Sequence, residues 1–177
     1  MEYLGSVIKG IYRDQLFDEE GTMKLDSGWN NNTIMTSFHT LLARLVRHDD
    51  GLLKAQAISL IMRFGEFSNS WGSLVVEPTD ETLTAAYTEF VLDETSGLKV
   101  AYLNVDGVEQ VKPSNRVQIT ATLGQNMPVG AVCPLGEFAV YLRCGTPDND
   151  HIINHVRHPV ISKTATDTLI RQIRFTF

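Results

Sequence analysis

The sequence predicts a mainly β protein, an antiparallel β-sandwich of jelly-roll type with one amphipathic α-helix near the N-terminus. Short alternating segments recur along the second half of the chain, with Gly, Pro and Asp turns between them. A single helical stripe, in residues 34–46, precedes them. The chain has 177 residues, which suits one domain with a small appendage. We therefore divide it into an N-terminal arm or strand pair, residues 1–27, and a helix-plus-sandwich domain, residues 28–177.

The first residues are expected to be extended. Val7–Tyr12 is the strongest strand candidate, and the acidic turn Asp18–Gly21 would join it to a second strand. Exposed sheet edges accept strands from neighbouring chains. The arm Met1–Lys24 is therefore a candidate for exchange between subunits.

A helix is predicted after the polar stretch Gly28–Thr33. Either Asn32 or Thr33 would cap it by accepting a backbone N–H from the first turn. Its apolar residues recur at steps of three and four and form one stripe: Ile34, Met35, Phe38, Leu41, Leu42, Leu45 and Val46. Gly51 is a suitable end for the helix.

The remaining elements are predicted as strands, and a loop carrying Trp71 spans residues 66–78. Asp106-Gly107 favours a tight hairpin, because Gly adopts positive φ angles without steric cost. The segments expected to be extended are Ala55–Phe64, Tyr87–Leu92, Val100–Val111, Arg116–Leu123 and Glu137–Cys144, followed by two closing strands.

The last ten residues alternate between a mostly apolar and a mostly polar face. Leu169, Arg171, Ile173, Phe175 and Phe177 share one parity, and the residues between them are mostly polar. Two Phe side chains at a free end would be costly to leave in water. This strand is therefore expected to be held in a sheet or by a neighbouring subunit.

Composition argues against several classes of partner. The net charge is −6 and no dense basic cluster is visible, which disfavours a nucleic-acid-binding surface. No apolar run has the length of a membrane span, and the N-terminus lacks the pattern of a secretory signal.

The sequence predicts no catalytic residue, no cofactor-binding residue and no metal ligand. Phosphate-binding, dinucleotide, nucleophile-elbow and HExxH motifs are absent from the sequence. In the segment HIINHVRH, an extended chain would place His151 and His155 on one face and His158 on the other, which disfavours a shared metal. Cys133 and Cys144 are expected to be small buried residues, although one disulfide stays possible. The acids of the predicted turns are expected to be solvated.

Aromatic residues near turns and the chain end are the candidates for an interface: Trp29, Phe67, Trp71, Phe175 and Phe177. Trp71 would pack over the core or into an interface, or serve as a sugar-stacking platform. Trp29 is expected to pack against the helix that it precedes.

Several stretches, taken in order, resemble a family of phage-tail and phage-tail-like structural proteins, associated with tail fibres or baseplates. They are SGWNNNTIMTSFHTLLARLV, ISLIMRFGEFSNSW, VVEPTDETLTAAYTE, VQITATL, PLGEFAVYLRCG and HPVISKTATDTLIRQIRFTF, and they cover residues 27–177. The resemblance implies a structural subunit of a virion tail or contractile injection particle, made in the bacterial cytoplasm. It implies no catalytic residues and no cofactor. The expected partners are other tail or baseplate proteins and further copies of the chain in a ring or trimer.

Two alternatives stay open from the sequence. The chain could be a carbohydrate-binding β-sandwich at a receptor-contacting tip, which would contact a host-surface glycan through Trp71 and through loop acids with a bound cation. It could also be an enzyme such as a glycan hydrolase, which needs two facing carboxylates that the sequence does not place.

Overall fold

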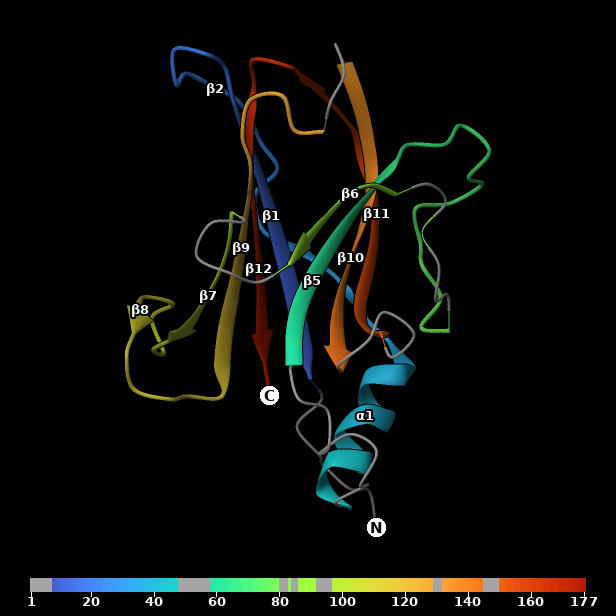
Figure 1. Ribbon diagram of the computed structural model, residues 1–177, viewed down its shortest axis with the longest axis vertical. Coiled ribbons are helices and arrows are strands. Elements are labelled where there is room, and N and C mark those ends of the chain that lie inside the picture. Colours follow the sequence, from blue (N-terminus) through green and yellow to red (C-terminus); the bar gives the residue numbers. More distant parts are fainter. Residues whose placement is uncertain are drawn as a thin grey trace.

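The computed structural model describes residues 8–47, 58–79, 83, 86–91, 97–128, 132–144 and 150–177. Figure 1 shows two sheets side by side, with the helix beneath one end of them. In chain order the elements are β1 (Lys9–Phe17), β2 (Met23–Asp26), β3 (Asn30–Asn31), β4 (Thr33–Ile34), α1 (Thr36–Val46), β5 (Ile58–Glu66), β6 (Ala86–Val91), β7 (Leu98–Leu103), β8 (Glu109–Gln110), β9 (Arg116–Leu123), β10 (Val132–Cys144), β11 (Asp150–Thr164) and β12 (Thr168–Thr176).

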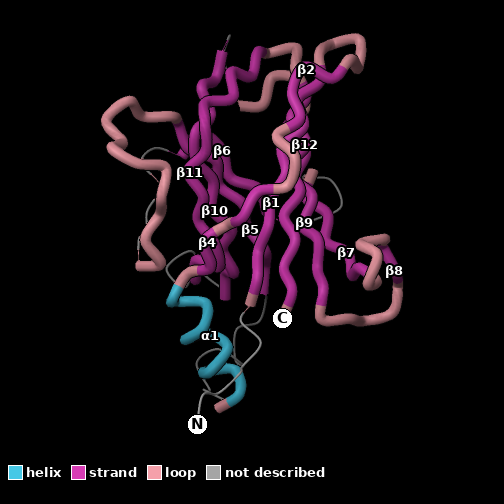
Figure 2. Tube along the Cα trace, turned by 180° about the vertical axis from the view of Figure 1, so that it is seen from behind, coloured by secondary structure: helices cyan, strands magenta, loops and turns pink. Residues whose placement is uncertain are grey.

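The strands form two antiparallel sheets that curl into a half-barrel, so the predicted mainly β, sandwich-like fold is confirmed. The seven-stranded sheet has the order β2-β1-β12-β9-β7-β8, and β3 also pairs with β1. The five-stranded sheet has the order β4-β11-β10-β5-β6. Viewed from behind, the long strands β10 and β11 lie on one side and β1, β12 and β9 on the other (Figure 2).

The main core lies between the two sheets. Alternate residues of β12 and β9 point into it from the seven-stranded sheet, because side chains of a strand alternate between its faces. The largest fully buried apolar side chains of this core are Phe64, Phe138, Leu41, Met62, Leu123, Leu135 and Leu169. A second, smaller buried cluster is separate from this core and consists of Met35, Ile61, Ala139, Tyr141 and Ile152. The five-stranded sheet is therefore apolar on both faces.

The helix occurs where the sequence predicts it, but it begins later. Thr33 and Ile34 pair with β11 as the short strand β4, and Met35 N donates to Ile153 O at 2.9 Å. Neither Asn32 nor Thr33 is therefore a helix cap, because the backbone there is already paired as strand. Phe38 and Leu41 pack into the main core, as the apolar stripe predicts. Gly51, the predicted end, lies outside the described residues.

The closing strand is confirmed as part of a sheet. β12 lies between β1 and β9, and each residue from Thr168 to Thr176 has a partner in β1. The face that carries Leu169, Ile173 and Phe175 is buried, as the alternation predicts.

The N-terminal arm is part of its own subunit's sheet from Lys9 to Asp26. β1 and β2 are joined by the acidic turn, as predicted, and Tyr12 and Leu16 of β1 are buried in the core. β1 pairs with β12 of the same chain along all nine of its residues, and exchange of the arm between subunits stays a prediction. Residues 1–7 lie outside the described part.

Candidate protein-docking site

The β7–β8 hairpin carries an exposed apolar edge at the end of the seven-stranded sheet. Its turn is built as predicted: Gly107 has a φ of 78°, and the Asn104 side-chain oxygen accepts from the N–H groups of Asp106 and Val108 at 2.9 Å. Three valines of the hairpin and its continuation are strongly exposed, namely Val105 at 78%, Val108 at 60% and Val111 at 98%. Clustered exposed apolar side chains are typical of interaction surfaces.

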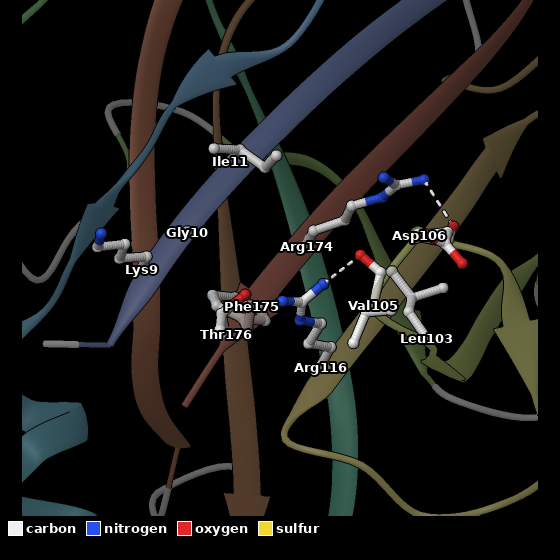
Figure 3. A pocket seen from close by; sticks show the side chains of 11 residues that line it. Lys9, Gly10, Ile11, Leu103, Val105, Asp106, Arg116, Arg174, Phe175 and Thr176 are labelled. Atoms are coloured by element: carbon white, nitrogen blue, oxygen red, sulfur yellow. Dashed lines mark hydrogen bonds between the residues drawn. The ribbon is translucent and has the colours of Figure 1, made fainter. Parts of the chain in front are cut away.

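A pocket of about 310 Å³ lies between this hairpin turn and strands β1, β9 and β12. Its cations come from three different strands: Lys9 from β1, Arg116 from β9 and Arg174 from β12. In Figure 3 the two arginines extend toward the hairpin turn, and Lys9 lies on the far side. Ile11 and Leu103 add apolar surface. We call this the cationic pocket.

The pocket carries excess positive charge. Arg116 Nη1 donates to Val105 O at 2.6 Å, and Arg174 donates to Gln118 Oε1 at 2.8 Å and Gly107 O at 3.3 Å. These acceptors are neutral. Within the described residues, neither arginine nor Lys9 has a carboxylate as salt-bridge partner, and Asp106 is the one acid in the lining.

The electrostatics of Arg174 reflect this arrangement. Burial, and secondarily the positive charge of Arg13, lower the pKa of the Arg174 guanidinium. Its guanidinium lies 4.2 Å from the centroid of the Trp29 ring, in a cation–π contact. A partly desolvated cation paired with neutral groups favours the binding of an external anion.

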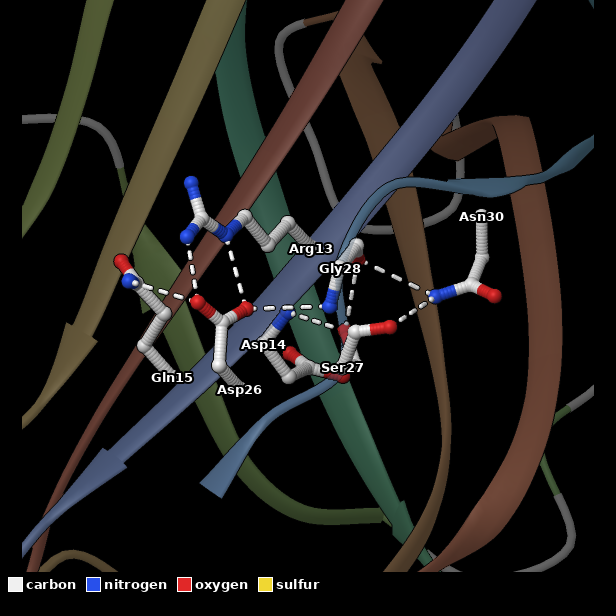
Figure 4. A network of polar contacts seen from close by, with 7 residues as sticks. All are labelled: Arg13, Asp14, Gln15, Asp26, Ser27, Gly28 and Asn30. Carbon is white, nitrogen blue, oxygen red and sulfur yellow. Dashed lines mark hydrogen bonds and ion pairs between the residues drawn. The ribbon is translucent and has the colours of Figure 1, made fainter. Parts of the chain in front are cut away.

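A polar corner between β1, β2 and β3 flanks Trp29 in sequence. Asp26 accepts from Arg13 Nε at 2.8 Å and from Gly28 N at 2.9 Å, and Arg13 Nη2 makes a second contact with the same carboxylate (Figure 4). The guanidinium of Arg13 holds the pKa of Asp26 well below its usual range. Asn30 Nδ2 donates to Ser27 O and Gly28 O at 3.1 Å. These bonds fix the loop on either side of Trp29.

The five aromatic residues predicted as an interface do not form one surface. Trp29 packs on Arg174 and not on the helix, because its loop lies beside β1. Phe67 and Trp71 form an edge-to-face pair at 5.4 Å, and Phe67 lies against Gly136 of β10, the strand that pairs with β5. Phe175 is buried in the core and unavailable to a partner. Phe177 lies beside Phe38 of the helix, with ring centroids 6.1 Å apart.

A second polar group is buried in the interior. Asp14 and Arg171 are opposite each other on β1 and β12 and form a two-bond ion pair at 2.6 and 2.8 Å. Arg171 Nη2 also contacts His158 Nε2 at 2.8 Å, and His158 Nδ1 contacts Pro159 O at 2.8 Å. Burial, and then Arg171, lower the pKa of His158 to about 4. The imidazole is therefore neutral, with its proton on Nδ1.

The three histidines of HIINHVRH are separated, and one cause is an irregularity in strand pairing that the sequence does not show. A register shift in the β10–β11 pair makes Ala139 the partner of His155 and Leu142 the partner of His151. Those two partners belong to different apolar clusters, so the two histidines lie on opposite faces, contrary to the strand prediction. His155 contacts the buried Glu137 at 3.1 Å.

The cysteines are both free and both buried, at opposite ends of β10, so they do not form the disulfide that the sequence left open. Across the described ranges, no cluster of three or more His, Cys, Asp or Glu residues has the arrangement of a metal site.

The cationic pocket was not predicted from the sequence. Arg116 and Arg174 are separated by 57 intervening residues, and Lys9 lies near the other end of the chain. Their common outward parity was a usable signal, but only the strand order β1-β12-β9 brings them together.

Comparisons with protein-family models, with curated proteins and with solved structures give no match. In the part of the chain that the structure describes, no helix is both long enough and apolar enough to cross a bilayer.

Proposed function

We propose that this chain is a non-enzymatic structural subunit of a phage tail or contractile injection particle, at the baseplate, collar or fibre attachment. The proposed mode of docking rests on one observation, the cationic pocket beside the exposed valines of the β7–β8 hairpin. A charged recess with an apolar rim is suited to binding another protein surface. The tail assignment itself rests on the ordered sequence resemblance over residues 27–177.

The arrangement of the interior polar groups supports a structural role. Asp14, Arg171 and His158 are all at most 2% exposed; Arg171 of β12 is bonded to Asp14 of the neighbouring β1 and contacts His158 of the facing sheet. Glu137 and His155 are likewise buried and in contact. Asp14 and His158 line a recess of about 270 Å³, but the carboxylate of Asp14 is bonded to Arg171, and the ring nitrogens of His158 contact Arg171 and Pro159. These contacts favour a role in packing and orientation.

The carbohydrate-binding alternative depends on Trp71. Its ring contacts Phe67 edge to face at 5.4 Å and lies 5.1 Å from the Arg157 guanidinium. A sugar-stacking platform needs a free ring face, so these contacts favour a packing role for Trp71. A glycan array on the purified protein separates the two functions: binding that is lost in Trp71→Ala would favour the carbohydrate reading.

The proposed function is tested by locating the protein. Antibody raised against the purified chain is applied to phage or phage-tail-like particles from producing cells and viewed by electron microscopy. Discrete labelling of the tail or baseplate is expected. Cells that make the chain but show no particle-bound label would contradict the proposal.

A further inference from the structure

The acidic turn and the cationic pocket lie at opposite ends of one strand. Lys9 begins β1 in the pocket, and Phe17 ends β1 immediately before Asp18, Glu19 and Glu20. Nine extended residues span roughly 30 Å. Figure 1 shows the β1–β2 turn at the upper end of the sheet and the C-terminal end of β12, which lines the pocket, at the lower end.

The acids at the tip of this turn are available. Asp18 is used internally, because its side chain accepts from Thr22 N at 2.7 Å. Glu19 and Glu20 are exposed, and no salt bridge joins either to a described residue. The turn is held in place from its second strand, where Lys24 Nζ contacts the Asp167 carboxylate at 2.9 Å. It is therefore an anchored projection with two free carboxylates.

The pocket has the complementary character. Lys9, Arg116 and Arg174 face a single lining acid, Asp106, so cations exceed acids by two. Both arginines donate hydrogen bonds to neutral oxygens, and Arg174 packs on the ring of Trp29. Arginine forks match carboxylates in shape and charge. A carboxylate pair would balance the charge of the pocket.

We propose that the Glu19–Glu20 turn of one copy of this chain binds in the cationic pocket of the next copy. The turn and the pocket are different patches on the same molecule, so the contact is head to tail, and a pair of copies still has one free turn and one free pocket. Repetition closes a ring if the rotation between copies allows, and otherwise builds a stack. The exposed valines of the hairpin rim add apolar area to this contact.

This inference rests on the proposed function only in taking self-association as the mode of action. It is tested with two charge-reversal variants, Glu19→Lys/Glu20→Lys in the turn and Lys9→Glu/Arg116→Glu in the pocket. Arg174 is left intact because it packs on Trp29. Association is measured by sedimentation velocity at ~50 mM and ~500 mM salt, where screening of surface charges differs strongly.

Wild-type association is expected at low salt and should weaken at high salt. Each variant alone should associate at least about tenfold more weakly, because like charges then meet at the contact. A 1:1 mixture of the two variants should recover assembly with alternating composition, since every turn then meets a pocket of opposite charge. Matched single reversals away from both patches, Glu66→Lys on β5 and Arg47→Glu after α1, should leave association unchanged.

The outcomes separate the two proposals. If the wild type assembles and both variants assemble equally well, the head-to-tail contact is overturned, whereas the proposed structural role is not contradicted. A mixture that stays dissociated, or a wild type that is monomeric at every concentration tested, would also overturn it. Binding of a carboxylated glycan to the pocket, lost in the Lys9→Glu/Arg116→Glu variant without any effect on assembly, would assign the pocket to a different ligand. Circular dichroism of each variant verifies the fold.

Discussion

Arg171 and Asp14 face each other across the β1–β12 pair, buried between the two sheets, with two hydrogen bonds of 2.6 and 2.8 Å. The guanidinium carbon also lies 3.9 Å from the centroid of the Phe138 ring on the opposite sheet. This ion pair therefore joins the neighbouring strands β1 and β12 and also contacts the facing sheet. Its energetic role depends on both partners being present, because an isolated buried charge is far more costly than a pair.

We expect Asp14→Ala to lower the free energy of unfolding by about 3–5 kcal/mol, because it leaves the Arg171 charge buried without its counter-ion. The double variant Asp14→Leu/Arg171→Met should be more stable than Asp14→Ala, since it removes both charges and keeps apolar volume. Urea denaturation followed by circular dichroism measures both. A loss below about 1 kcal/mol for Asp14→Ala would show that the pair is not energetically coupled in this way.

The stability of the protein should fall in acid through His158. Its folded pKa of about 4 lies below the ordinary value of 6.5, because burial and the Arg171 charge disfavour protonation, although Asp14 and Glu137 act in the opposite direction. The unfolded chain therefore takes up a proton first as pH falls from 6.5 toward 4. Stability is complete above 6.5 and declines by about 3 kcal/mol across that window.

The measurement is the free energy of unfolding at several pH values between 7 and 4 for the wild type and for His158→Gln. The Gln variant does not titrate in this window, so its pH slope should be smaller by close to one proton. Equal slopes in the two proteins would refute the role of His158. The carboxylates contribute a background slope to both, and the difference between the proteins isolates the histidine.

The sequence predicted the face of β12 but not the contacts on it. Alternation placed Arg171 on the same side as Leu169 and Ile173, and that side is buried. What alternation cannot supply is the partner, since Asp14 lies 157 residues away and is matched to Arg171 only by the β1–β12 register. A charged residue on an apolar parity was nevertheless a signal that a buried counter-ion existed somewhere in the chain.

Local irregularities limited the prediction of the other sites. The register shift between Val140 and Tyr141 moves His151 and His155 to opposite faces, and an unbroken alternation cannot reveal a bulge. The strand pairing of Thr33 and Ile34 with β11 similarly overrides their compatibility with the helix. The tertiary partner decided the local structure in both cases, whereas hairpins such as Asp106-Gly107 were set by local chemistry.

The Phe67–Trp71 loop should pack on the five-stranded sheet only because Gly136 has no side chain. A β-carbon at Gly136 would lie 2.4 Å from Phe67 Cα, which is backbone and cannot rotate away. We expect Gly136→Ala to cost about 1–3 kcal/mol and to shift the fluorescence of Trp71, measured in a Trp29→Phe background. The matched control is Gly72→Ala, where a β-carbon meets nothing within 4 Å.

The loop prediction is refuted if Gly136→Ala and Gly72→Ala have equal unfolding midpoints and equal Trp71 emission. A midpoint shift without a change in emission would place the strain elsewhere in β10 and would also count against a role in seating the loop.

Phe175 and Phe177 should contribute very differently to the free energy of unfolding. Phe175 is 3% exposed in the core, whereas Phe177 is 38% exposed beside Phe38. Phe175→Ala should cost about 3–5 kcal/mol, because it opens a cavity between packed sheets. Phe177→Ala should cost under about 1.5 kcal/mol, because much of its ring already contacts water.

The backbone at the chain end should stay in place in Phe177→Ala. Phe177 N donates to Asn115 O at 2.9 Å, and Asn115 Nδ2 donates to Phe177 O at 2.9 Å, so the last residue is held by bonds that do not involve its ring. Hydrogen exchange of β12 amides should therefore remain slow in Phe177→Ala and become faster in Phe175→Ala, where the whole fold is less stable. Fast exchange of these amides in the wild type would contradict a clamped terminus. Equal unfolding costs for the two variants would show that Phe175 is not a core residue in solution.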